Sequence, residues 1–143
     1  MEIAILPVDA TCMHKTGGFL RRRACGLTAA GQCVYCGEPF CGSHGTRGEE
    51  YYEVCERAGC RAKYDDLAHH REWMERHRHD NLAGHCAEDD CEQAPEIACQ
   101  RCTLRFCHPH LRPRTVQEGD LDRVVTVQLM LCPHCSARRR LWD

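Results

Sequence analysis

The chain has 143 residues, of which 6% are aromatic and 14 are cysteines, and its formal net charge is −2 from 19 basic and 21 acidic residues. So few large apolar side chains build only a marginal hydrophobic core, especially if the chain divides into two parts. The charge lacks the basic excess expected of a nucleic-acid-binding protein, and no run approaches the roughly 18 apolar residues that span a bilayer, so neither nucleic acid nor a membrane is the favoured partner.

The high cysteine content indicates either a disulfide scaffold or metal binding. Residues 1–9 lack the basic start and the apolar stretch of a secretory signal, so we expect a reducing, cytoplasmic environment. Paired cysteines with CxxC spacing are usually metal ligands in that environment. The cysteines therefore predict zinc sites, and they predict that zinc rather than a hydrophobic core holds the fold together.

One pattern of ligand-type residues occurs twice, sixty-six positions apart. The two copies are Cys25, Cys33, Cys36, Phe40, Cys41, His44 and Cys91, Cys99, Cys102, Phe106, Cys107, His110. One further cysteine precedes each copy and a cysteine pair follows it; these are Cys12, Cys55, Cys60 and Cys86, Cys132, Cys135. Each module thus offers eight ligands, enough for two tetrahedral zinc sites with every position filled. We expect about four zinc ions per chain, and no open position at which zinc could activate a water molecule.

The ligand pairs of a module can be connected in series or crossed. Crossing places Cys12, Cys25, Cys41 and His44 on one zinc and Cys33, Cys36, Cys55 and Cys60 on another. In the second module it places Cys86, Cys91, Cys107 and His110 on one zinc and Cys99, Cys102, Cys132 and Cys135 on the other. We favour crossing because it ties distant segments together, but spacing alone does not separate the two schemes. Four histidines beside these ligands are alternatives to a neighbouring cysteine: His14, His85, His108 and His134.

Secondary structure is predicted around these ligands. Residues 50–54 read as a strand running into Cys55, and a helix follows from residue 61 to about residue 82, ending near Gly84. One face of that helix carries Tyr64, Leu67, Met74 and Leu82, while its histidines at 69, 70, 77 and 79 are expected on a solvated face. Residues 115–117 and 124–131 are predicted to form a hairpin with its turn at Gly119 and Asp120, and residues 136–142 a short helix.

These elements predict three parts of the chain. Zinc module 1 spans residues 1–62, a helical linker spans residues 63–84, and zinc module 2 spans residues 85–143. The expected fold class is a small zinc-stabilised α+β fold with two tandem cross-brace, treble-clef-like modules. Each module consists of a zinc knuckle, a β-hairpin and a helix.

The ligand pattern resembles the cross-brace zinc fingers, the group that includes RING, B-box and PHD-type domains. The CxxCxxxxFCxxH stretches that end at His44 and His110 look most like B-box-type fingers. The long gap from His110 to the closing CPHC sequence, residues 132–135, is more similar to RING or PHD domains. A protein-recognition function is what this resemblance implies.

RING-type ubiquitin ligases bind a conjugating enzyme through apolar residues near their first and last ligand pairs, and many place an arginine just after the final ligand. The matching positions here are Met13, Phe19, Leu20, Arg61, Pro133 and, three residues after the last ligand, Arg138. Module 2 departs from the RING pattern because residues 87–90 are acidic where RING domains are apolar.

The leading hypothesis is therefore a RING-like ligase or adaptor that holds a ubiquitin-type conjugating enzyme and a target together. It needs no catalytic residue, because every cysteine has a ligand role and a zinc-bound thiolate is a poor nucleophile. A B-box-like scaffold without a transfer role is the first alternative. A nucleic-acid-binding zinc protein, using the arginines at 21–23 and 138–140, is the second.

Overall fold

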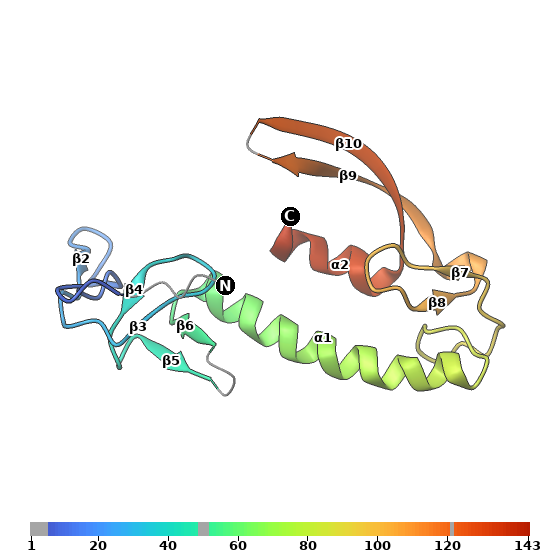
Figure 1. Ribbon diagram of the computed structural model, residues 1–143, viewed down its shortest axis with the longest axis horizontal. Helices are drawn as coiled ribbons and strands as arrows, with labels where there is room; N and C mark the ends of the chain where they lie inside the picture. The colour runs from blue at the N-terminus through green and yellow to red at the C-terminus, as the bar shows by residue number, and fades with distance from the viewer. Residues whose placement is uncertain (1–5, 49–51, 121) are drawn as a thin grey trace. The chain divides into compact units, whose positions relative to one another are not determined.

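The computed structural model describes residues 6–48, 52–120 and 122–143 (Figure 1). The chain forms two compact units, unit 1 (Met1–Asp66) and unit 2 (Leu67–Asp143). Both are small α+β structures in which short antiparallel strand pairs surround clusters of cysteines. None of the helices that the structure describes is both long enough and apolar enough to cross a bilayer.

The described residues of unit 1 form three two-stranded antiparallel pairs. They are β1 (Lys15–Thr16) with β2 (Arg23–Ala24), β3 (Gly31–Gln32) with β4 (Pro39–Phe40), and β5 (Gly45–Arg47) with β6 (Glu53–Cys55). The predicted strand into Cys55 is confirmed over β6, and its predicted start at residues 50 and 51 lies outside the described residues. These strands have only two or three residues, so the pairs cannot build a core by themselves.

The core of unit 1 consists mostly of cysteines. Phe40 and Val54 are the large apolar side chains buried there, and Tyr64 packs against them from the first turns of the long helix. Phe40 fits against the backbone of Gly31 and Gly45, where an added methyl group would overlap its ring. The small size of this apolar cluster leaves most of the stabilisation to the cysteine-rich sites.

Helix α1 (Ala58–Leu82) begins three residues before its predicted start and ends at the predicted place, where Gly84 has a φ of +83°. Its apolar residues do not form one face, because Tyr64 packs in unit 1 whereas Trp73 and Met74 pack in unit 2. Leu82, predicted on the apolar face, is 85% exposed. The prediction was wrong because a helix that belongs to two units has two different contact faces.

After the part of α1 that belongs to it, unit 2 has β7 (Ile97–Ala98) paired with β8 (Arg105–Phe106), followed by the 3-10 helix η2 (His108–His110). A long ribbon of β9 (Arg112–Asp120) and β10 (Arg123–Leu131) comes next, and α2 (Pro133–Trp142) ends the unit. Helix α2 starts three residues earlier than predicted, because Pro133 occupies its first turn and the Cys132 side chain accepts a hydrogen bond from the Cys135 N–H at its N-cap.

The ribbon confirms the predicted second strand but not the predicted turn. Gly119 and Asp120 belong to β9, and the strands are joined by residues 121 and 122. Gly119 is paired with Val124 at a φ of +156°, where a side chain would overlap the carbonyl of Arg123. A close backbone approach within the strand therefore requires this glycine.

The core of unit 2 is larger than that of unit 1. Phe106, Val116 and Leu131 are each at most 1% exposed and pack among buried cysteines. The Trp73 ring stacks on the ring of His134 at 3.8 Å between centroids and lies 6.5 Å from the ring of Phe106. Helix α1 thus covers the unit 2 core with an aromatic side chain.

A Gly45→Ala substitution tests the packing in unit 1. The new methyl group overlaps the ring of Phe40, which is buried, so we expect the free energy of unfolding to fall by about 1–3 kcal/mol. Gly42→Ala is the matched control, because Gly42 is exposed and its added methyl group meets nothing within 4 Å. Urea unfolding of the zinc-loaded proteins measures both effects, and equal stability of the two variants would contradict the packing.

Candidate metal centres

The cysteines and two of the histidines gather into four clusters. In each cluster the four ligand-type atoms lie within 4.8 Å of one another. The members are Cys12, Cys25, Cys41, His44; Cys33, Cys36, Cys55, Cys60; Cys86, Cys91, Cys107, His110; and Cys99, Cys102, Cys132, Cys135. These groups are those of the crossed scheme, in which the first and third ligand pairs of a module share one site. We call them the histidine site and the cysteine site of each unit.

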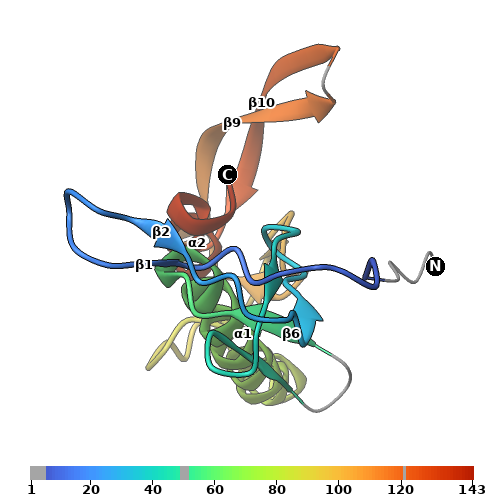
Figure 2. The same ribbon diagram turned by 90° about the vertical axis from the view of Figure 1, so that its left-hand side faces the viewer.

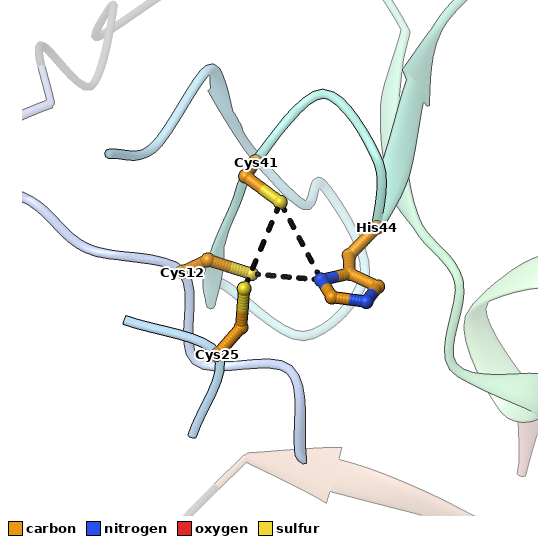
Figure 3. Close-up of side chains that lie close together, drawn as sticks. All are labelled: Cys12, Cys25, Cys41 and His44. Carbon is orange, nitrogen blue, oxygen red and sulfur yellow. Dashed lines mark hydrogen bonds between the residues drawn. The ribbon is translucent and has the colours of Figure 1, made fainter. Parts of the chain in front are cut away.

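In the histidine site of unit 1, the side chains of Cys12, Cys25, Cys41 and His44 point toward one another (Figure 3). Cys12 and Cys25 flank the β1–β2 pair, whereas Cys41 and His44 lie between β4 and β5. The His44 ring turns Nδ1 toward the cysteines, at 3.4 Å from Cys41 Sγ and 3.6 Å from Cys12 Sγ. The Sγ atoms of Cys25 and Cys41 are 4.0 Å apart.

The histidine site of unit 2 repeats this geometry with different surroundings. His110 Nδ1 lies 3.1 Å from Cys107 Sγ and 3.5 Å from Cys86 Sγ, and Cys91 and Cys107 are 3.8 Å apart at sulfur. In the cysteine sites, the Cys36–Cys55 and Cys102–Cys132 sulfur separations are 3.8 and 3.9 Å. Two sequence segments that share little besides their ligand-type residues therefore fold into the same arrangement.

These separations fit a tetrahedral zinc ion. Zinc bonds of about 2.3 Å to sulfur and about 2.0–2.1 Å to nitrogen imply edges of about 3.8 Å between sulfurs and about 3.5 Å between sulfur and nitrogen. A disulfide would instead bring two sulfurs to about 2.05 Å. Each cluster can hold one metal ion, and its thiolate and imidazole donors are those that zinc prefers in structural sites.

Backbone N–H groups point at several of the sulfurs. Cys107 N–H donates to Cys86 Sγ at 3.3 Å, and Cys132 N–H donates to Cys99 Sγ at 3.4 Å. In unit 1, burial acts to raise the pKa of Cys33, but hydrogen bonds from the backbone of Cys55 and other residues lower that pKa to about 7. Such donors stabilise the thiolate form that a metal ion requires.

The pKa values of other thiols in the clusters shift in both directions. Burial raises the pKa of the Cys86 thiol to about 11. In the unit 2 cysteine site, hydrogen bonds from Cys102 and Cys132 lower the pKa of Cys99, whereas the hydrogen bonds with Cys102 and Cys135 raise the pKa of Cys132. Neighbouring thiolates repel one another, so the thiols of one cluster do not all lose their protons easily. A divalent cation supplies positive charge that offsets this repulsion.

The four alternative histidines lie outside the clusters. The ring of His14 stacks on that of His44 at 4.3 Å between centroids, so it supports a ligand from outside. His134 stacks on Trp73, and its Nε2 atom lies 2.9 Å from Nδ1 of His70. His85 and His108 are exposed.

Sequence reasoning missed the residues that hold α1 against unit 2. His77, predicted on a solvated face, is 1% exposed; its Nδ1 atom lies 2.7 Å from Asp80 Oδ2 and its Nε2 atom 3.2 Å from Asp89 Oδ1. Asn81 bonds both the N–H and the carbonyl of Arg105. Asp89 lies between two ligands of the histidine site, so the helix positions the ligand-bearing loop. The spacing of His77 and Asp80 on one helix is a sequence signal for their contact. No feature of the sequence indicates the contact of His77 with Asp89.

The residues predicted to bind a partner fall in two places. Met13, Phe19 and Leu20 are 42%, 91% and 91% exposed, on or beside the β1–β2 hairpin of unit 1. Arg61 donates to Thr46 Oγ1 at 3.2 Å, and its guanidinium lies 5.3 Å from the centre of the Tyr64 ring. The remaining two lie on α2 of unit 2, where Pro133 is exposed and Arg138 is half-buried.

No protein-family model, curated protein or solved structure matches this chain.

We expect purified protein to contain close to four zinc ions per chain. Structural zinc contributes roughly 10–16 kcal/mol per site in zinc-finger peptides, so a strong chelator is expected to unfold both units rather than only inactivate them. Elemental analysis together with circular dichroism during chelation measures this. Two zinc ions per chain, or a fold that survives complete metal removal, would contradict the four-site assignment.

Cys102→Ser tests one site by leaving three buried ligands without their metal. We expect unit 2 to unfold and zinc content to fall by up to about two ions per chain, because its two sites share the same chain segments. His108→Ser is the control, since His108 lies beside Cys107 but is exposed and outside the clusters. The ligand assignment fails if the two variants retain equal zinc and equal melting behaviour.

Proposed function

We propose that the zinc-loaded chain is a protein-recognition protein that works as a RING-like ligase or adaptor in a ubiquitin-type conjugation pathway. The observation that carries this proposal is the crossed grouping of ligand pairs in both units. That connectivity resembles the cross-brace fingers, in which two metal ions fix loops for partner binding. Partners are then held side by side without covalent attachment to the protein.

The partner surface proposed for unit 1 is the apolar tip, defined as Phe19 and Leu20 in the β1–β2 hairpin. Two adjacent large apolar side chains at 91% exposure contribute nothing to the core of unit 1. Binding energy at protein interfaces is concentrated in a few such anchors that become buried in the complex. Met13 extends this surface toward the histidine site with its half-exposed side chain.

A non-covalent mechanism follows from the inventory of thiols. All fourteen cysteines belong to the four clusters, so none is left as a free nucleophile. Acceleration of transfer would then come from positioning two bound partners, which converts an encounter between them into a step within one complex.

A non-enzymatic scaffold is the second candidate, and the contacts of Arg61 favour it. Arg61 is tied to Thr46 and Tyr64, so its side chain already has a structural role. The nucleic-acid alternative is weaker, because Arg139 in the run 138–140 bonds the Thr115 carbonyl and the Asp143 carboxylate. This run is at least partly engaged within unit 2 and is not a free basic patch.

A reconstituted conjugation assay with a ubiquitin-type conjugating enzyme tests the apolar tip. Phe19→Asp is expected to weaken binding of that enzyme at least tenfold and to slow transfer, with zinc content unchanged. Val8→Asp is the matched control, since Val8 is 98% exposed in unit 1 but lies outside the hairpin. Equal effects of the two substitutions, or none from either, would remove the apolar tip from the proposal.

Arg61→Ala separates the ligase from the scaffold. A ligase that uses this arginine on its partner loses acceleration, whereas a scaffold binds partners without accelerating transfer in any variant. Thr46→Ala is the control, because it removes the hydrogen-bond partner of Arg61 and keeps the arginine. Transfer slowed by Arg61→Ala and not by Thr46→Ala supports the ligase; binding without any acceleration by the unsubstituted protein leaves the scaffold.

A further inference from the structure

The β9–β10 ribbon of unit 2 has two edges, and its surroundings cover them unequally. Its register runs without a bulge from the Leu131–Arg112 pair to the Arg123–Asp120 pair. In such an antiparallel pair, the backbone N–H and C=O groups of alternate residues face the partner strand or face outward. Once the backbone groups of one residue are known to face outward, those of every second residue along the same strand face outward as well.

Met130 shows which residues of β10 have outward-facing backbone groups. Its N–H donates to Gln100 Oε1 at 2.6 Å, and its carbonyl accepts from Gln100 N–H at 3.0 Å. Gln100 lies outside the ribbon, so both groups of Met130 face outward. By alternation, the backbone groups of Val124, Thr126 and Gln128 face outward as well.

The edge of β9 is blocked by two features. The Thr115 carbonyl, opposite Gln128, accepts from Arg139 of α2 at 2.8 Å, which agrees with the outward set. Pro113, opposite Met130, faces outward too and has no N–H to offer. A strand added along β9 would thus meet a missing donor and an occupied acceptor.

The edge of β10 is open beyond Met130. The outward N–H and C=O groups of Val124, Thr126 and Gln128 have no hydrogen-bond partner among the residues that the structure describes. All three residues are exposed, and the distal end of the ribbon extends away from α2 (Figures 1 and 2). Unpaired groups along an uncharged stretch are a template for another strand.

We propose that this edge is a self-association site, at which β10 pairs with β10 of a second copy of the chain. The strands run antiparallel about a two-fold axis at Thr126, so that Val124 of each copy lies opposite Gln128 of the other. The outward groups of the two copies then satisfy one another. A two-fold interface of this kind joins the same surface from both subunits and closes on itself.

The side chains of β10 suit a second copy as the occupant. In this register Val125 of each copy lies beside Val127 of the other, and both are β-branched residues that pack well across strands. Val125 is 41% exposed and gains cover from this contact. Residues 124–131 contain no charged residue, so no like charges meet, and Gln100 ends the pairing at Met130.

The pairing is short, which predicts weak association. A few backbone hydrogen bonds and four valines cover much less than the roughly 1,600 Å² of a typical stable interface. We therefore expect an equilibrium between monomer and dimer that shifts with protein concentration. This inference is independent of the proposed function, because it involves neither the apolar tip nor Arg61.

Sedimentation equilibrium of the zinc-loaded full chain over a range of concentrations tests the site. The average mass is expected to rise from the monomer value of 16.4 kDa toward twice that value. Thr126→Pro removes an outward N–H that the ribbon itself does not use, as Pro113 already does on β9, and is expected to weaken association at least tenfold. Gln117→Pro, at the paired position on β9, is the matched control and is expected to leave association unchanged.

A charge exchange at the two-fold axis gives a second test that does not depend on proline. Thr126→Lys and Thr126→Glu each place like charges opposite each other, so each variant alone is expected to stay monomeric, and their mixture is expected to associate. Gln117→Lys on β9 is the control that keeps association. The proposal is overturned if the unsubstituted protein stays at monomer mass, if association survives Thr126→Pro, or if the mixture fails to associate.

Discussion

The structure depends on the interleaving, along the chain, of the residues that form its four cysteine and histidine clusters. In unit 1, Cys33 and Cys36 lie in the chain between the two pairs of the histidine site, and their partners Cys55 and Cys60 lie beyond it. Each site therefore draws its ligands from both sides of a ligand pair that belongs to the other. Closing the first site shortens the loop that the second must close, which lowers the entropy cost of the second. Metal binding at these clusters would for this reason be coupled to folding in each unit.

The clusters are alike in the two units, whereas the chain segments between the ligand residues differ. Between its histidine and its closing pair, unit 1 has the short β5–β6 hairpin, whereas unit 2 has the long β9–β10 ribbon. Between its first two ligands, unit 1 has the β1–β2 hairpin with two exposed apolar residues, and unit 2 has a short acidic loop held by His77. Similar sites thus carry different surfaces, which is where binding properties are found.

Spacing indicated the ligand pairs, because the separation within a pair reflects a chemical requirement that is local in the chain. It did not decide how the pairs combine into four groups, because that depends on the fold. The strand β10 and the end of α1 at Gly84 followed from equally local signals, namely β-branched residues and a glycine with positive φ. The burial of His77 could not be predicted, because its second carboxylate comes from a loop that only the fold brings near. The turn was misplaced since Gly119 serves a close approach inside a strand, a role that its sequence context does not distinguish from a turn.

The two proposed contact surfaces belong to different units, so binding at one surface involves none of the residues of the other. The apolar tip lies in the chain between Cys12 and Cys25 of the histidine site of unit 1, whereas the open edge belongs to β10, which leads into Cys132 of unit 2 and is bounded by Gln100 at Met130. All fourteen thiols lie in the four clusters, so the proposed recognition function would depend on how many partners the chain holds and for how long. Weak pairing of two chains would double the number of apolar tips in one assembly and raise the effective concentration at the second tip without any new contact. Unit 2 would then influence binding at unit 1 by increasing the number of apolar tips in one assembly, with no structural change passing between the units.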